Sequence, residues 1–158
     1  MAPRPRQAAR GFTLIELMIG LAVVGILMAL ALPTYLDSIR KNRRSEGIAA
    51  LSRVQLTQER WRANAAAYAA PTELAASAPA GLGLPVTTDK GLYSIAITEA
   101  NATSFTATAT AVDGKSQAND TRCKVLGVRM TGGNISYGAR TASESSVDWT
   151  DPNRCWAR

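Results

Sequence analysis

A single carboxylate, Glu16, lies near the start of a long apolar run that extends from Phe12 to Leu36. A charged side chain inside a membrane-spanning segment is costly and is retained where another group partners it. We therefore expect Glu16 to have a partner.

Two cysteines, Cys123 and Cys155, are the next residues with distinctive chemistry. An even pair without CxxC spacing, in a chain with a membrane-export signal, favours a disulfide over a metal site. Such a bond would contribute about 3–4 kcal/mol in the chain-entropy model. The region after residue 36 is rich in Ala, Thr and Ser and has Phe105 as its only Phe. We expect so thin a core to depend on this bond.

The chain of 158 residues contains no histidine. This removes the commonest general base, the usual catalytic triads and most catalytic zinc sites. No phosphate-binding glycine loop is present, and Gly81-Leu82-Gly83 and Gly132-Gly133 are typical of turns. We therefore expect the protein not to be an enzyme, and we expect no cofactor and no metal.

The formal net charge is +6, and the basic residues cluster in the N-terminal eleven residues, in residues 37–62 and after residue 121. Basic clusters suit nucleic acid or anionic lipid, whereas many are only solvated surfaces or contacts to neighbouring subunits. Trp149 or Trp156 could stack on bases. Acidic residues interrupt the last cluster, so we expect scaffold contacts and at most weak DNA binding. The candidate DNA contacts are Arg122, Lys124, Arg129, Arg140, Arg154 and Arg158.

These residues must be positioned by a helix and a sheet. Residues 12–36 are long and apolar enough to span a bilayer. An amphipathic stripe at steps of three or four then predicts that the helix continues to about Tyr68, with Pro71 stopping it. The stripe consists of Ile48, Leu51, Val54, Gln58, Trp61, Ala65 and Tyr68.

Alternating apolar and polar residues predict antiparallel strands at residues 92–98 and 104–111, joined by a hairpin at Asn101-Ala102-Thr103. Residues 123–130 predict a third strand and residues 135–137 a short fourth. The apolar face of this sheet should bury the helix stripe, and a Cys123–Cys155 bond would tie the C-terminal segment to the third strand.

The N-terminal residues carry a family resemblance. A basic leader with Arg4, Arg6 and Arg10 precedes Gly11, and Phe12 follows, then Thr-Leu-Ile-Glu and the apolar run. This pattern resembles type IV pilins with a class III leader, and related pseudopilins. The resemblance implies that a cytoplasmic prepilin peptidase cuts between Gly11 and Phe12 and methylates Phe12. A classical signal peptidase cut after Ala29-Leu30-Ala31 is disfavoured because the apolar run is long and contains Glu16.

The resemblance also implies a fold and a division of the chain. We expect an α+β type IV pilin fold, with a long N-terminal helix on a small antiparallel sheet and a disulfide-closed C-terminal loop. The expected parts are the leader 1–11, the transmembrane or filament-core half of the helix 12–36, and the periplasmic or extracellular head 37–158. The residues from Ser116 to Cys123, with Cys155-Trp156 near the end, look like minor pilins of the PilE type.

The implied function is structural. The protein would be a subunit, most similar to a minor pilin, that enters a type IV pilus through its apolar helix, where Glu16 meets the amine of Phe12 in its own chain or a neighbour's. Expected partners are other pilin subunits, the prepilin peptidase and the inner-membrane assembly platform. Before assembly the chain would cross the inner membrane once with its N-terminus in the cytoplasm, and afterwards it would lie in the extracellular pilus, serving adhesion, twitching motility or DNA uptake. The alternatives are a DNA-binding minor pilin and a type II secretion pseudopilin.

Overall fold

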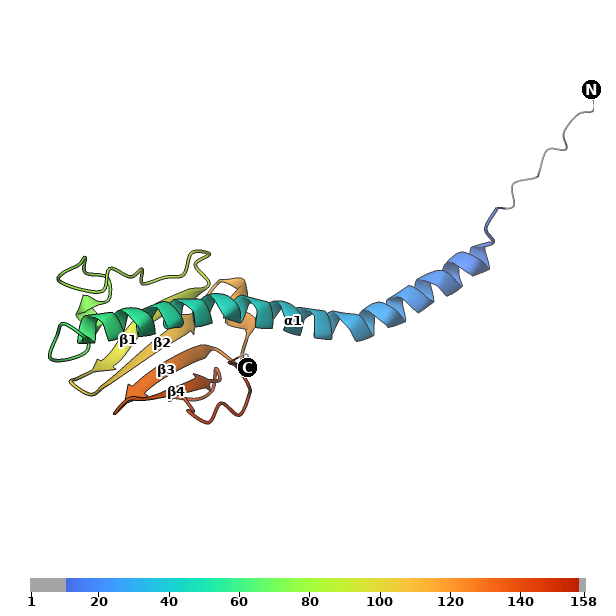
Figure 1. Ribbon diagram of the computed structural model, residues 1–158. Helices are drawn as coiled ribbons and strands as arrows, with labels where there is room; N and C mark the ends of the chain where they lie inside the picture. Colours follow the sequence, from blue (N-terminus) through green and yellow to red (C-terminus); the bar gives the residue numbers. More distant parts are fainter. Residues whose placement is uncertain (1–10, 157–158) are drawn as a thin grey trace, which may run out of the picture. The chain divides into compact units, whose positions relative to one another are not determined.

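The computed structural model describes residues 11–156. Its elements follow in the order α1 (Leu14–Arg62), the short 3₁₀ helix η1 (Pro71–Glu73), β1 (Tyr93–Ala100), β2 (Ser104–Ala111), the 3₁₀ helix η2 (Ser116–Asn119), β3 (Val125–Thr131) and β4 (Asn134–Arg140) (Figure 1). The predicted fold is confirmed: one long N-terminal helix, a four-stranded antiparallel sheet and a C-terminal disulfide.

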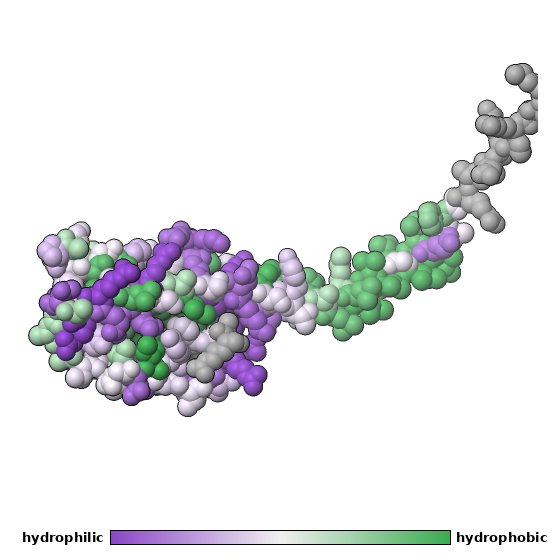
Figure 2. All heavy atoms as spheres, in the orientation of Figure 1, coloured by the Kyte–Doolittle hydropathy of each residue, from purple (hydrophilic) through white to green (hydrophobic). Residues whose placement is uncertain are grey.

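The chain divides into two compact units, which meet between Ser38 and Ile39. In the first unit the large apolar side chains of α1 are exposed. Figure 2 shows these residues as a nearly continuous hydrophobic surface, in contrast to the mixed surface of the second unit. By length and composition this helix could cross a membrane.

The second unit, residues 39–158, contains the sheet in the order β1-β2-β3-β4. The part of α1 that belongs to this unit runs across one face of the sheet (Figure 1). Buried and partly exposed residues alternate along β2, as the sequence predicts: Phe105, Ala107 and Ala109 are buried, while the intervening threonines are partly exposed. Leu51 and Val54 of α1 join this core.

Gly47 allows the helix to approach the sheet closely. A Cβ at this position would lie 3.2 Å from the Leu126 side chain and 3.2 Å from the Tyr93 ring. A larger residue would need these core side chains to move, and interiors are packed too densely to allow that without cost.

The predicted end of the helix is wrong. Helix α1 ends at Arg62, not near Tyr68, so Pro71 does not terminate it. Contacts with the residues that follow the helix explain the early end. The buried amide of Gln58 donates to Ala69 O (3.0 Å) and accepts from Ala69 N (2.8 Å), while Arg62 Nη1 donates to Ala65 O (2.7 Å). Both contacts hold the chain in a reversal directly after the last helical turn.

The strands are placed as predicted, with small shifts in their bounds. β2 has the predicted limits, β1 continues to Ala100, β3 begins at Val125 rather than at Cys123, and β4 extends to Arg140. β4 is longer than predicted because it pairs with β3 along its whole length, from Asn134 to Arg140, and on its other edge Asp148 pairs with Ala139 through two backbone hydrogen bonds, of 3.0 and 2.8 Å. This partner on its outer edge comes from a segment that shows no period in the sequence.

Candidate functional site

The N-terminal end of α1 carries the residues expected to be processed and to guide assembly. Gly11 and Phe12 precede the helix and are exposed, and Glu16 lies in its first turn. The leader arginines Arg4, Arg6 and Arg10 lie outside the described residues.

Glu16 has a local partner that the sequence analysis missed. Its Oε2 accepts hydrogen bonds from Thr13 N and Thr13 Oγ1, both at 3.0 Å, and Glu16 N donates to Thr13 Oγ1 at 3.3 Å. This reciprocal pattern is a capping box, whose signature of Thr followed three residues later by Glu is present in Thr13-Leu-Ile-Glu16. The cap fixes the carboxylate beside the N-terminal end of the helix. Its pairing with the amine of Phe12 stays a prediction.

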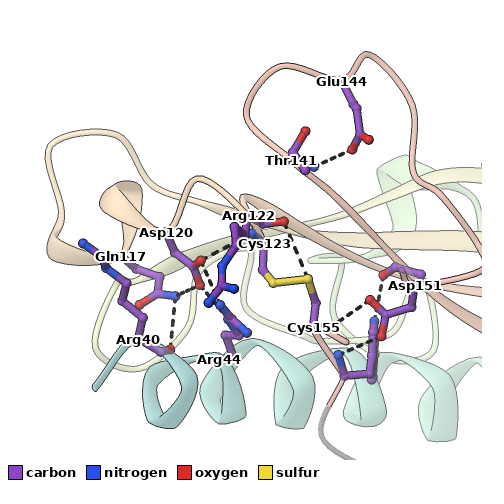
Figure 3. Close-up of a disulfide and its surroundings, with 12 residues drawn as sticks. Arg40, Arg44, Gln117, Asp120, Arg122, Cys123, Thr141, Glu144, Asp151 and Cys155 are labelled. Atoms are coloured by element: carbon purple, nitrogen blue, oxygen red, sulfur yellow. Dashed lines mark hydrogen bonds and ion pairs between the residues drawn. A yellow bond between two sulfur atoms is a disulfide. The ribbon is translucent and has the colours of Figure 1, made fainter. Parts of the chain in front are cut away.

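Within the head, the disulfide is the centre of a polar network (Figure 3). Cys123 and Cys155 are bonded, as the cysteine pair predicted, and both are buried. Cys123 N donates to Asp120 Oδ1 at 3.3 Å. On the other side Cys155 N donates to Asp151 Oδ1 at 2.9 Å. Asp151 adopts φ of 48°, a left-handed conformation that Asp tolerates better than most residues.

Asp120 also forms a buried ion pair with α1. Arg44 Nε and Nη2 donate to Oδ2 and Oδ1 of Asp120 at 2.6 and 2.9 Å, and the two side chains are 4% and 2% exposed. Gln117 Nε2 adds a third donor to this carboxylate at 2.9 Å (Figure 3). In the sequence Arg44 is one of several basic residues between positions 37 and 62. Its partner is 76 positions away, and no local signal could have identified it.

Tyr93 lies next to this network in the core. Burial, and secondly the Asp120 carboxylate, raise the pKa of its phenol well above the usual range. The hydroxyl of Tyr93 is buried and has no hydrogen-bond partner among the described residues. At neutral pH this phenol is therefore uncharged.

The head surface has two open grooves that contain the candidate DNA contacts. The first, which we call the aromatic groove, has a volume of about 600 Å³. It is lined chiefly by Lys41, Ile48, Tyr137, Trp149, Arg154 and Trp156. Trp156 is fixed there because its Nε1 donates to Gly138 O at 2.7 Å and its ring lies 4.6 Å from the Tyr137 ring.

The second groove lies on the sheet face opposite α1, and we call it the threonine groove. Its volume is about 620 Å³. It is lined chiefly by Thr106, Thr108, Thr110, Arg129, Arg140 and Trp149. The guanidinium carbon of Arg129 lies 4.5 Å from the centre of the Trp149 ring, a cation–π contact.

The structure thus separates the predicted basic residues. Arg129 and Arg140 line the threonine groove, whereas Arg154 lines the aromatic groove. Lys124 Nζ is paired with Asp113 Oδ1 at 2.5 Å. Arg122 is exposed next to the disulfide, and Arg158 lies outside the described residues.

Comparison with known proteins agrees with this architecture. A family model described as "Type IV minor pilin ComP, DNA uptake sequence receptor" matches residues 33–127, more than half of the chain. The chain belongs to this family of type IV minor pilins. A second model, the prokaryotic N-terminal methylation motif, matches residues 6–32.

Individual relatives of this minor pilin are pilus proteins too. The type IV major pilin protein PilE1 of Neisseria gonorrhoeae is 37% identical over 99 residues, which cover 58% of this chain and 40% of that protein. The fimbrial protein EcpC of Eikenella corrodens is 54% identical over 41 residues, covering 26% of this chain and 27% of that protein. A major fimbrial protein FimA of Dichelobacter nodosus is 54% identical over 39 residues, covering 25% and 24%. The chain therefore spans only about a quarter to two fifths of the length of these relatives.

Proposed function

We propose that this minor pilin is a structural, non-enzymatic subunit of a type IV pilus that assembles with other pilin subunits through the first half of α1. The single observation that supports this best is the exposed apolar surface of residues 14–36 in a helix that continues into a folded head. So much exposed apolar surface requires a membrane or other helices to cover it. Lipid would cover it before assembly, and neighbouring subunits afterwards.

Processing in this proposal follows the N-terminal motif. The prepilin peptidase cuts after Gly11 and methylates Phe12, while the helix spans the inner membrane with its N-terminus in the cytoplasm. The assembly platform then moves the chain into the pilus. Mass spectrometry of sheared pili tests this step: we expect a methylated Phe12 at the start of the mature chain. A mature start after Ala31, or an intact Met1, would contradict it.

Glu16 sets the axial register in this proposal. Its Oε2 is engaged by Thr13, and a neighbouring amine could pair with the same carboxylate in the filament core. At about 4 Å and an effective dielectric near 20, such a pair interacts by roughly 4 kcal/mol before desolvation is subtracted. We expect Glu16→Val to be inserted and cleaved but poorly incorporated into pili. Thr13→Val is the matched control, because it removes part of the cap and keeps the charge. Normal incorporation of Glu16→Val would show that the pairing is not needed.

A second candidate function is DNA reception for uptake. It is favoured by the matched family model, whose description names a DNA uptake sequence receptor. The aromatic groove suits this function better than the threonine groove, since it combines Arg154 and Lys41 with the rings of Trp149 and Trp156. Asp151 also lines it, and Lys124 is paired with Asp113 elsewhere, so the positive field is limited.

We expect duplex DNA to bind a soluble fragment of residues 39–158 only weakly at physiological salt and without sequence preference. A gel shift tests this, with Arg154→Ala as the variant and Lys115→Ala as the control. Contacts to phosphates would make the affinity fall steeply with salt, by on the order of a hundredfold between 50 and 200 mM for three or four contacts. Sub-micromolar, sequence-selective binding that Arg154→Ala abolishes would establish the receptor function instead.

A further inference from the structure

The threonine groove has a floor made of hydroxyl groups. Thr106, Thr108 and Thr110 alternate along β2 with the buried alanines, so all three point away from the core. In an antiparallel strand such residues repeat every ~7 Å. All three residues line the groove, so their hydroxyl groups face it. Each can therefore both donate and accept a bond from a ligand.

One wall of the groove is the segment that ends at Trp149, and two glycines make room for it. Gly127 on β3 and Gly138 on β4 are direct cross-strand partners. A Cβ at Gly127 would lie 3.2 Å from Trp149 Cη2, and a Cβ at Gly138 would lie 2.5 Å from Asp148 O. Side chains at Gly127 and Gly138 would displace the segment that ends at Trp149. The absence of a Cβ at both positions therefore allows this segment to pack against the sheet.

A guanidinium lies at each end of this wall. In the cross-strand register Arg129 is opposite Thr106 on β2, and Arg140 is opposite Val125, which is itself opposite Thr110. The two arginines therefore stand four residues apart along the strands, about 13 Å. Arg140 Nη1 donates to Glu144 O at 2.6 Å, which holds that side chain in place.

The threonine hydroxyls and the two arginines together favour one class of ligand over others. Sugar hydroxyls donate and accept hydrogen bonds, as the threonine hydroxyls do, and a carboxylate matches the fork of an arginine. A nucleic acid fits less well, because the groove holds two cations with Glu99 at its β1 side and the Trp149 ring is already covered by Arg129.

We propose that the threonine groove binds an acidic polysaccharide, whose carboxylate groups pair with Arg129 and Arg140 and whose ring hydroxyls bond to the threonines. Glu99 lies on the same cross-strand row as Thr106 and Arg129. It disfavours carboxylates on the β1 side, so the acidic edge of the polymer faces the wall. This site is independent of the assembly helix.

The test uses the full chain in detergent micelles and an oligomer of galacturonic acid as the probe, with binding followed by calorimetry and by tryptophan fluorescence. A neutral maltose oligomer and duplex DNA are the comparison ligands. Thr108→Val removes one hydroxyl without changing the shape of the floor, and Arg129→Lys keeps the charge but loses the fork. Thr72→Val and Lys115→Ala are the matched controls, because both residues are exposed and lie outside the groove.

We expect the galacturonate oligomer to bind more tightly than the maltose oligomer. Thr108→Val should weaken binding by roughly threefold to tenfold and Arg129→Lys by about tenfold or more, with the controls unchanged. The proposal is overturned if the acidic oligomer does not bind at millimolar concentration, if both oligomers bind equally, or if Thr108→Val and Arg129→Lys leave its affinity unchanged. It is also overturned if duplex DNA binds this groove in preference, shown by a DNA affinity that is lost in Arg129→Lys. Incorporation into pili should stay normal in both groove variants, which separates this test from that of the assembly function.

Discussion

Replacing Asp120 by Asn should destabilise the head more than any other single change to a charged residue of comparable size. The substitution preserves the shape of the side chain but removes the charge that faces Arg44, whose side chain is only 4% exposed. Removing one partner of a buried ion pair costs about 3–5 kcal/mol, because the remaining charge is left uncompensated. For a domain of this size each kcal/mol lowers Tm by roughly 3–5 °C. We therefore expect Tm to fall by about 10–25 °C.

The chain provides a matched control for this prediction. Asp113 pairs with Lys124 at a similar distance but is 92% exposed, and exposed ion pairs contribute at most about 1 kcal/mol. Thermal unfolding of residues 39–158, followed by circular dichroism, should therefore show little change in Asp113→Asn. The double variant Arg44→Met with Asp120→Asn should recover most of the lost stability, since no charge is then buried alone and the Asn oxygen can still accept from Cys123 N. Equal, small shifts in Asp120→Asn and Asp113→Asn would refute the reasoning.

Three further predictions concern the disulfide, the core phenol and the glycine pair. Cys155→Ser should lower the free energy of unfolding by about 3–4 kcal/mol and expose the segment after Gly138 to protease, as measured by denaturant titration and limited proteolysis; unchanged protease resistance would contradict it. Because the pKa of Tyr93 is raised in the folded state, its contribution to stability is complete below about pH 10 and is lost as the pH rises further towards the folded pKa. Tyr93→Phe should therefore flatten the alkaline part of the stability curve, and an identical decline in both proteins would show that another group causes it. Gly138→Val should detach the wall around Trp149 and shift the tryptophan emission of the protein towards that of an exposed indole, whereas Ile135→Val, at an exposed position of the same strand, should leave that spectrum unchanged.

The sequence by itself determined the elements whose pattern is local. The apolar run with a single Glu predicts the first half of α1, and the alternation of Thr and Ala defines β2 to its limits, because side-chain direction in a strand repeats every two residues. The cysteine pair was also readable, since only two cysteines are present and no competing pairing exists. Even the capping box of Thr13 and Glu16 was open to sequence reasoning, because its signature spans only four residues.

Tertiary structure alone decided the features that depend on distant partners. The end of α1 at Arg62 follows from the contact of Gln58 with Ala69, which overrides a helical pattern that continues in the sequence. The ion pair of Arg44 and Asp120 joins two elements that no periodicity relates. The grooves depend on the register of β3 and β4, which aligns Gly127 with Gly138. This glycine pair leaves room for the segment around Trp149, which has no periodic sequence pattern, to pack against the sheet. Local propensity carries no information about such pairings, because their free energy arises only when the chain brings the two partners together.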